Sequence, residues 1–359
     1  MARKRDNILM ARFSALGDIA MTLPEVYDAC LASPERDFYF LTRQHPSKMF
    51  ANAPSNLTVA GVDLERYKGL RGMWRLAREL RDEYGIDTFL DLHDVLRTRM
   101  LGIALRMKGV RIFRLDKGRR AKKALTRRKS KEQVQLRRMT DRYRDVFAKA
   151  GLPLADRFRS LFGDGKGDPG DFAKVTGPKQ DGEKWLAVAP FAKHPGKIYP
   201  MHLMKKVIDH FAVKPGWKIF VFGFGDNEIR DIDALTGTRK NVVNMARAGI
   251  GIRAELSLLS HCDVMLSMDS ANMHLASLVG VRVVSVWGAT HPYCGFKGFG
   301  QQETDIVQLP MTCRPCSVFG NKPCARGDYH CLRGIPPSMI VNKVNKVLFT
   351  QDKEDRRKE

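Results

Sequence analysis

The sequence lacks the features that mark membrane-spanning, secreted or disulfide-rich proteins. None of its apolar runs approaches the roughly 18 residues that a membrane-spanning helix needs. Seven cysteines in 359 residues do not make a disulfide scaffold. Basic residues Arg3, Lys4 and Arg5 precede a short apolar run, but Arg12 and Asp18 interrupt that run, so we expect no signal peptide. These absences predict a globular cytoplasmic protein.

Acidic residues are scarce relative to basic ones, which gives a formal net charge of +23. The imbalance is concentrated in residues 106–144, where 17 Lys and Arg residues accompany three acids. Such a segment predicts a polyanionic partner, namely nucleic acid, an anionic membrane surface or a phosphorylated substrate. The alternative is a solvated basic helix without a partner. Residues 117–131 contain no aromatic side chain for base stacking, and no zinc-finger motif accompanies them, which disfavours nucleic acid.

The length and the apolar pattern predict two α/β domains. Short apolar runs alternate with helical patterns in both halves of the chain, which is typical of βαβ units and parallel sheets. Residues 163–184 are rich in Gly, Pro, Asp and Lys and lack an apolar period, so the domain boundary is expected there. The expected strands are 8–11, 37–42, 86–92 and 110–115 in the first half, and 185–190, 217–223, 263–268 and 282–288 in the second.

A carboxylate stands where the first expected strand passes into a helix. In the stretch 12-RFSALGDIAMTLPEV-26, the chain leaves the strand through Ser14 to Asp18 and then shows apolar residues at helical spacing. Asp18 is a good helix cap, which is the local interpretation. The alternative is that it faces a ligand crevice, because strand-to-helix turns of α/β proteins point their side chains there.

Two further strand-to-helix turns carry candidate phosphate-binding groups. In 263-DVMLSMDSANMHLASLVG-280, a helix begins at Ser270 or shortly after it, so its first N–H groups and its dipole can bind an anion. Alternatively, Asp269 only caps this helix and His274 packs internally. In 190-PFAKHPGKIYP-200, Lys193 and Lys197 can contact phosphate oxygens, or they are solvated loop lysines.

The stretch 221-VFGFGDNE-228 has two glycines after a strand, which permit a close approach of the backbone to a ligand. Glu228 can accept hydrogen bonds from a ribose, or it is an exposed acid in the first turn of a helix. The stretch is not a GxGxxG motif, so it is weak evidence for a nucleotide by itself.

Four cysteines are grouped near the C-terminus. Cys313, Cys316, Cys324 and Cys331 have the spacing Cys-x2-Cys-x7-Cys-x6-Cys, which contains one good chelating pair. Four thiolates would form a closed structural zinc site. Reduced thiols packed in a loop and a labile disulfide are the alternatives, because the second pair is not tightly spaced.

Taken together, four motifs resemble glycosyltransferase family 9, the lipopolysaccharide heptosyltransferase family. They are 14-SALGDIAMTLP-24, 197-KIYP-200, 269-DSANMHLASLVGVRVVSVWGATHP-292 and 313-CRPCSVFGNKPC-324. The resemblance implies a GT-B fold with two Rossmann-like doubly wound domains that face a cleft. We expect residues 1–165 to bind the acceptor and residues 166–359 to bind the nucleotide sugar. It also implies inverting transfer, usually from ADP-heptose, without a catalytic metal.

The resemblance assigns roles to individual residues. Asp18 corresponds to the family's proposed general base, and Lys197 to the lysine that contacts the donor phosphates. The residues expected at the diphosphate and the ribose are Asp269, Ser270, Ala271, His274, Glu228 and, from the adjacent loop, Lys193. Ala271 and Asn272 stand where the family usually has Gly and Pro, so the identity of the donor sugar stays open. Ala is tolerable at a helix start where φ is negative.

The expected acceptor is an anionic, lipid-linked saccharide of the lipopolysaccharide or lipooligosaccharide core. We therefore expect peripheral association with the cytoplasmic face of the inner membrane, to which basic residues near anionic lipid contribute about 1 kcal/mol each. The residues expected to contact the acceptor are Arg97, Arg99, Arg119, Arg120, Lys122 and Lys123. One alternative is a family member that uses another nucleotide sugar. The other is a basic nucleic-acid-binding α/β protein, but that alternative does not explain the turns at Asp18 and Asp269.

Overall fold

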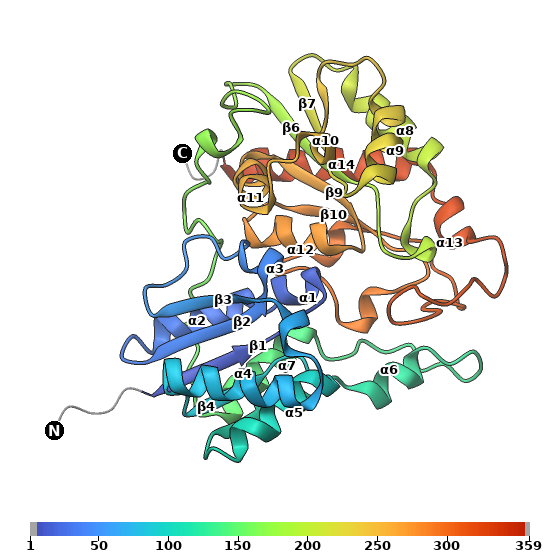
Figure 1. The fold of residues 1–359 in the computed structure, drawn as a ribbon. Coiled ribbons are helices and arrows are strands. Elements are labelled where there is room, and N and C mark those ends of the chain that lie inside the picture. The colour runs from blue at the N-terminus through green and yellow to red at the C-terminus, as the bar shows by residue number, and fades with distance from the viewer. Residues whose placement is uncertain (1–5, 356–359) are drawn as a thin grey trace. The chain divides into compact units, whose positions relative to one another are not determined.

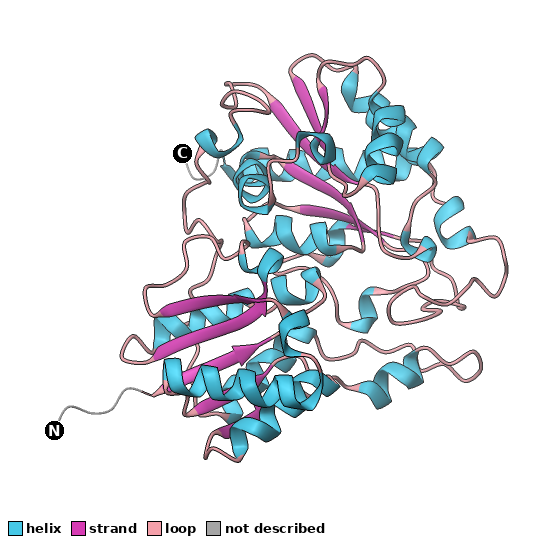
Figure 2. Cartoon of the chain, viewed as in Figure 1, coloured by secondary structure: helices cyan, strands magenta, loops and turns pink. Residues whose placement is uncertain are grey.

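The chain folds into two α/β units, each built around one parallel sheet (Figures 1 and 2). The structure is a computed structural model and describes residues 6–355, with side chains to residue 351. The first unit comprises the residues up to Gly118 together with Arg137–Gly163. The second comprises Arg119–Leu136 and the chain from Asp164 onward. Two doubly wound units are what the sequence predicts.

The described helices include none that is both long and apolar enough to cross a membrane.

The sheet of the first unit has five strands in the order β3-β2-β1-β4-β5, and all pairs are parallel. Its central strands are apolar on both faces, as expected for a sheet that helices cover on both sides. The strands are β1 (Asn7–Ala11), β2 (Asp37–Arg43), β3 (Leu57–Val62), β4 (Thr88–Asp91) and β5 (Arg111–Arg114).

Helices α4 and α5 bury their apolar sides in the core of the first unit. Leu76 and Leu80 of α4 and Leu101 and Leu105 of α5 pack in one cluster with Phe89 of β4. Helix α4 ends at Gly85, whose φ of 60° is left-handed and favours glycine. The helices of this unit are α1 (Leu16–Ala20), α2 (Leu23–Ala32), α3 (Gln44–Ser47), α4 (Gly69–Tyr84), α5 (Leu96–Arg106), α7 (Met139–Lys149) and the 3₁₀ turn η1 (Leu64–Tyr67).

The sheet of the second unit has six parallel strands in the order β11-β10-β9-β6-β7-β8. The strands are β6 (Lys184–Ala189), β7 (Trp217–Val221), β8 (Val242–Asn244), β9 (Val264–Met268), β10 (Val283–Val286) and β11 (Ile306–Val307).

Both faces of the second sheet are buried. Leu186 and Val188 of β6 pack with the apolar sides of helices α8 and α14, whereas Trp185, which alternates with them, packs against Phe172 and Phe220. The helices of this unit are α6 (Arg119–Leu125), α8 (Met201–Ala212), α9 (Asp226–Thr236), α10 (Met245–Ala248), α11 (Ile252–His261), α12 (Ala271–Leu278), α13 (His330–Arg333) and α14 (Pro337–Asp355). The 3₁₀ turns are η2 (Pro169–Phe172), η3 (Pro195–Lys197), η4 (Pro292–Cys294) and η5 (Glu303–Asp305).

Residues 119–136, the basic segment, belong to the second unit, although the sequence suggested an N-terminal domain of residues 1–165. Leu125 and Leu136 are buried in a small apolar cluster with Cys294 of the second unit. The observed unit boundary differs from the expected one because of this cluster. Charged residues dominate the composition of the segment, but its two buried leucines pack in the second unit. The chain therefore leaves the first unit after Gly118 and returns to it at Arg137.

Polar contacts also attach the basic segment to the second unit. The ammonium group of Lys131 donates to the backbone carbonyls of Cys313 at 2.6 Å and Pro315 at 3.0 Å. The Lys122 ammonium lies 4.5 Å from the centre of the Phe296 ring, and Lys122 is buried. Part of the basic charge of this segment therefore serves packing.

Candidate functional site

The strand order of each sheet marks where a ligand site is expected. In the first sheet the chain runs outward from β1 through β2 and β3 on one side, and then through β4 and β5 on the other. In the second sheet β6 plays the same part, with β7 and β8 on one side and β9 to β11 on the other. Ligands of open α/β sheets bind at such reversals, beyond the carboxyl ends of the two central strands. The relevant loops follow β1 and β4, and β6 and β9.

Asp18 lies in the loop and short helix that follow β1. Its carboxylate accepts the backbone N–H of Ala15 at 3.2 Å. Asp18 is therefore not the N-cap residue of α1, which is Ala15, but it supports the first turn from the third helical position. The same Oδ2 atom lies 3.1 Å from the guanidinium of Arg12, and the Asp18 side chain is partly exposed. Asp18 is thus held in place by two contacts while part of its side chain still reaches solvent.

Arg12 was not among the residues singled out from the sequence, yet it anchors this turn. Its side chain is buried, its guanidinium donates to the carbonyl of Leu92, and it lies 5.6 Å from the centre of the Tyr143 ring. A buried cation next to a carboxylate restricts the position of that carboxylate. The sequence signal that could have identified Arg12 is its position directly after an apolar strand.

His93 follows β4 and faces the Asp18 loop. Its Nδ1 accepts the N–H of Phe13, and its Nε2 pairs with the Ser14 hydroxyl, each at 3.4 Å. Burial, and after it the charge of Arg12, lower the pKa of His93 to about 3. His93 is therefore neutral at physiological pH. No local motif in the sequence marks His93, although it stands directly after the expected strand 86–92.

Several cations surround the carboxyl end of the first sheet. Lys117 and Arg43 lie close enough to His93 to contribute to its low pKa. Arg97 helps to lower the pKa of Glu65, behind the larger effect of Lys68. These side chains come from loops and helix starts at one edge of one sheet, where an anionic ligand would meet them.

Arg99, an expected acceptor contact, is engaged in a local ion pair. Its Nε and Nη2 both lie 2.7 Å from Oδ1 of Asp94, which follows His93. Asp91, at the end of β4, is fully buried and accepts the N–H groups of His93 and Asp94 at 3.1 and 2.7 Å. Its other oxygen accepts from Arg114 at 3.1 Å. This network fixes the loop that carries His93.

In the second unit, Lys197 and Asp269 meet at the reversal of the strand order. The Lys197 ammonium lies 3.1 Å from Oδ2 of Asp269, and the hydroxyl of Thr290 donates to the same oxygen at 2.8 Å. Lys197 comes from the loop after β6 and Asp269 from the end of β9. Gly320 has a φ of 74°, and a Cβ there would lie 2.6 Å from Cγ of Lys197. The lysine is thus enclosed by the chain around it.

Helix α12 begins beside this ion pair. Ser270 is its N-cap residue and Ala271 its first residue, which lies outside the left-handed region, so Ala is tolerated here without backbone strain. Asn272 follows. His274 is buried in the body of the helix, which agrees with the packing alternative. The N–H groups of the first turn remain available for an anion.

Glu228 lies in the first turn of α9, which follows β7, and Lys193 lies in the loop after β6. The Glu228 carboxylate accepts the N–H of Phe224 at 2.8 Å, and burial raises its pKa. Lys193 is exposed. Tyr199 is buried, and its hydroxyl donates to the carbonyl of Ile335 at 2.7 Å, so this residue of the 197-KIYP-200 motif has a packing role.

A sequence model of glycosyltransferase family 9 (heptosyltransferase) matches residues 73–324, more than half of the chain. The chain belongs to glycosyltransferase family 9. The resemblance inferred from its four motifs is confirmed. Asp18 lies outside the matched range.

Among known family 9 proteins, lipooligosaccharide heptosyltransferase 2 of Campylobacter jejuni serotype O:2 is 23% identical over 344 residues, which cover 93% of this chain and 95% of that protein. The protein of the same name from serotype O:6 matches over 176 residues, 47% of this chain and about half (52%) of that protein, also at 23% identity. Lipopolysaccharide heptosyltransferase 1 of Pseudomonas aeruginosa is 22% identical and covers 86% of this chain and 85% of its own length.

Solved structures of family 9 members share the fold. The glycosyl transferase family 9 protein from Veillonella parvula has a TM-score of 0.72 at 16% identity and covers 98% of this chain and 99% of that chain. E. coli heptosyltransferase WaaC with ADP has a TM-score of 0.64 at 16% identity and covers 95% of this chain and 99% of that chain. The GT-B fold expected from the sequence is confirmed.

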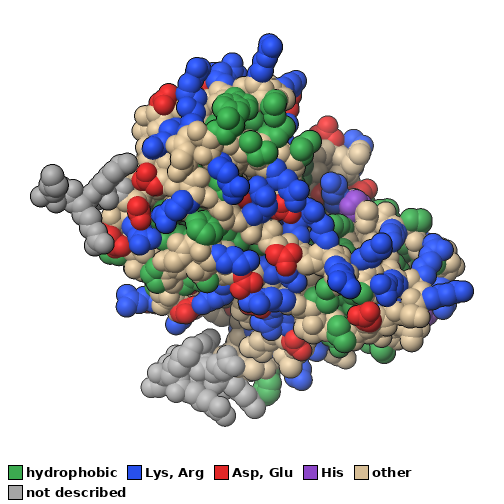
Figure 3. Space-filling view, turned by 90° about the horizontal axis from the view of Figure 1, so that it is seen from below, with side chains coloured by type: hydrophobic (Ala, Val, Ile, Leu, Met, Phe, Trp, Pro, Cys, Tyr) green, Lys and Arg blue, Asp and Glu red, His purple; other side chains and the backbone are tan. Residues whose placement is uncertain are grey.

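The four basic-segment residues expected to contact the acceptor of this family 9 chain lie in the second unit. Arg119, Arg120 and Lys123 are exposed on α6, whereas Lys122 is buried against Phe296. Within the first unit, the cation beside Asp18 is instead Arg12. Arg43 and Lys117 act on His93, and Arg99 and Arg114 pair with Asp94 and Asp91 in the loop that carries His93. Figure 3 shows Lys and Arg side chains spread over the face that it presents, with fewer acids among them.

A structural zinc site was one of three possibilities for the four cysteines, and the structure gives it no support. Among residues 6–351, no group of three or more His, Cys, Asp or Glu side chains is placed to hold a metal ion. The Cys316 thiol donates to the carbonyl of Cys313 at 3.6 Å, and burial raises the pKa of Cys331 to about 11. None of the four, including Cys324, is joined in a disulfide, which agrees with the packed-thiol alternative.

Proposed function

We propose that this chain transfers a heptose from ADP-heptose to the core saccharide of a lipopolysaccharide or lipooligosaccharide acceptor, with inversion at the anomeric carbon. The names of the family 9 relatives support this donor and this acceptor. The observation that carries the proposal is the pairing of Lys197 with Asp269 at the strand-order reversal of the second sheet. Asp18 stands at the equivalent position of the first sheet.

Asp18 is the proposed general base. The acceptor hydroxyl attacks the anomeric carbon from the face opposite the nucleotide, and the Asp18 carboxylate takes its proton. Arg12 and the Ala15 N–H hold that carboxylate, which limits the orientations that it must search. His93 is neutral and contacts the backbone of the Asp18 loop, so we assign it a positioning role.

Lys197 and the start of α12 are the proposed diphosphate site. As the glycosidic bond breaks, negative charge develops on the β-phosphate, and an ammonium group with converging N–H donors stabilises it. Asp269 forms an ion pair with the Lys197 ammonium. It would keep the lysine in position, while Ser270 and Ala271 contribute backbone N–H groups. These donors supply the charge stabilisation that a metal provides in other transferases, so transfer without a catalytic metal is proposed.

Lys193 and Glu228 are proposed to contact the phosphates and the ribose of the donor. The cations at the carboxyl end of the first sheet are proposed to meet the anionic groups of the acceptor, and Arg97, which acts on Glu65, is among those that the sequence suggested. A lipid-linked acceptor lies at a membrane surface. We therefore propose a peripheral location on the cytoplasmic face of the inner membrane, supported by the net charge of +23.

The proposal is tested first by calorimetric titration with ADP, GDP and UDP without added metal, followed by turnover of ADP-heptose. We expect selective binding of ADP that Lys197→Ala weakens and that Lys206→Ala, a change at an exposed helix position, leaves unchanged. A preference for UDP or GDP would contradict the proposed donor. It would instead favour a family 9 enzyme for another nucleotide sugar, an alternative that Ala271 and Asn272 kept open.

A further inference from the structure

Phe224 is the most exposed large apolar side chain among the described residues, with 85% of its surface accessible. It lies in the loop between β7 and α9. Single exposed apolar residues are common on protein surfaces, so exposure alone does not indicate a function. The position of Phe224 is more informative, because its loop follows the strand next to β6 at the carboxyl edge of the second sheet.

The backbone of Phe224 is tied to Glu228, the proposed ribose contact. The Phe224 N–H donates to Oε2 of Glu228 at 2.8 Å. Gly223 makes room for this contact, because a Cβ there would lie 3.1 Å from the same oxygen and 2.8 Å from Ile232. Gly225 has a φ of 82°, which glycine adopts readily. The aromatic residue thus stands between two glycines with its backbone fixed and its ring in solvent.

We propose that the Phe224 ring stacks on the purine base of the nucleotide donor. This inference rests on the proposed function, because it takes Glu228 as the group that holds the ribose. The base is joined directly to the ribose, so a ring three bonds away from the backbone nitrogen that contacts Glu228 can reach its face. An exposed aromatic ring offers a flat apolar surface, and stacking on such surfaces tolerates any base. Phe224 then strengthens binding, while selectivity among bases comes from other contacts.

The test is a titration of the full-length protein with ADP, comparing wild type with Phe224→Ala, Phe224→Leu and Phe224→Trp. Truncation of a stacking residue typically weakens binding by about ten-fold or more. We expect that loss in the alanine variant, a smaller but clear loss in the leucine variant, and affinity equal to or above wild type in the tryptophan variant. Val213→Ala is the matched control, because Val213 is 73% exposed at the end of α8. The mutated side chain is exposed, so folding is preserved.

Fluorescence of the Phe224→Trp variant reports contact directly. Stacking of the base on the new indole would quench its emission, beyond any change that ADP causes in the four native tryptophans. Unchanged ADP affinity in Phe224→Ala, or leucine as good as phenylalanine, would overturn the stacking assignment while leaving the proposed function standing. If the wild-type protein did not bind ADP, the proposed function would fail, and this inference with it.

Discussion

At the residue scale, the proposed chemistry depends most on the carboxylate of Asp18. Replacing it with Asn keeps the size of the side chain and an oxygen that can accept the Ala15 N–H, but removes the proton acceptor. A positioned general base typically contributes about 10²–10⁴-fold to a rate. We expect Asp18→Asn to lower kcat within that range and to leave ADP affinity unchanged, as measured by steady-state kinetics and calorimetry. Full turnover by the variant would remove the assignment of Asp18 as the base.

His93 permits a second prediction at this scale, concerning pH. Because its pKa is lowered to about 3, it stays neutral from pH 5 to pH 9, and protonation of His93 contributes no step to the pH–rate profile in that range. His93→Gln retains a side-chain acceptor for the loop backbone, whereas His93→Ala does not. We expect kcat to fall more in the alanine variant, with the shape of the profile kept in both. A lost acidic limb in His93→Gln would contradict a purely positioning role.

The sequence predicted the residues that stand alone in recognisable turns, and it missed those that act through tertiary neighbours. Lys197 and Asp269 were expected at the donor phosphates, and the structure brings them to 3.1 Å. Arg12 follows β1 and His93 follows β4, so the two come together only when these strands pair. No local pattern encodes that pairing, so their interaction with the Asp18 loop could not be deduced from spacing.

At the scale of elements, long apolar runs were predictable and short or exposed strands were not. The runs at β1, β2, β6, β7 and β9 were all expected. The edge strand β3, 57-LTVAGV-62, is mostly exposed or half-buried, so it has no apolar run. Strands β8 and β11 have three and two residues, too few to show a period. The sequence therefore predicted two parallel α/β sheets, but not the strands β3, β8 and β11.

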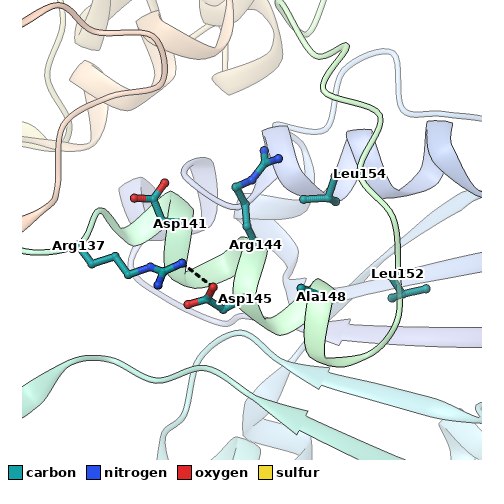
Figure 4. A pocket seen from close by; sticks show the side chains of 7 residues that line it. All are labelled: Arg137, Asp141, Arg144, Asp145, Ala148, Leu152 and Leu154. Atoms are coloured by element: carbon teal, nitrogen blue, oxygen red, sulfur yellow. Dashed lines mark hydrogen bonds and ion pairs between the residues drawn. The ribbon is translucent and has the colours of Figure 1, made fainter.

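Arg144 joins helices α2 and α7 through a buried carboxylate. It lines a surface hollow along α7, in which Arg137 also pairs with Asp145 at 2.6 Å (Figure 4). One nitrogen of Arg144 lies 3.1 Å from Glu25 of α2, and another 2.7 Å from Asp156. Glu25 is buried, and burial raises its pKa from 4.5 to about 7, although Arg144 opposes the shift.

The raised pKa of Glu25 predicts a pH-dependent stability. Between pH 4.5 and about 7 the folded protein retains a proton that the unfolded chain has lost, so this group's contribution to stability falls as the pH rises through that window and is constant above it. In the wild type, we expect this group to lower the free energy of unfolding by about 2 kcal/mol as the pH rises through that window. Glu25→Gln should remove this decrease. Urea unfolding at pH 5 and pH 8 measures the difference in the free energy of unfolding. Glu35→Gln, at an exposed position, is the control. Equal pH dependence in wild type and Glu25→Gln would contradict the assignment.

At the scale of the whole molecule, net charge and the placement of the basic segment bear on the proposed membrane association. The basic segment leaves the first unit and packs on the second through Leu125, Leu136 and Lys131. Those contacts hold its backbone to the unit proposed to bind the donor, while Arg128 and Lys129 stay exposed. A fixed segment with free cations meets an anionic surface at a smaller entropic cost than a disordered tail would.

The corresponding prediction is that anionic vesicles bind this protein through the basic segment. Vesicles with 30% phosphatidylglycerol, about the anionic content needed for a strong surface potential, should bind wild type at low salt and release it as salt screens the charges. Replacing Arg120, Arg128 and Lys129 by Ala should weaken binding by about 100-fold, since each cation contributes about 1 kcal/mol. The control replaces three exposed cations of the first unit, namely Arg71, Arg78 and Lys108.

Both triple variants carry the same net charge, so their comparison separates position from total charge. A large loss in the basic-segment variant with a small loss in the control would assign the contact to the basic segment. Equal losses would mean that the whole charged surface binds lipid diffusely and that the segment has no special part. If neither variant changed vesicle binding but the first lost affinity for duplex DNA with a reduced salt dependence, the charge would serve nucleic acid, and the proposed peripheral location would have to be abandoned.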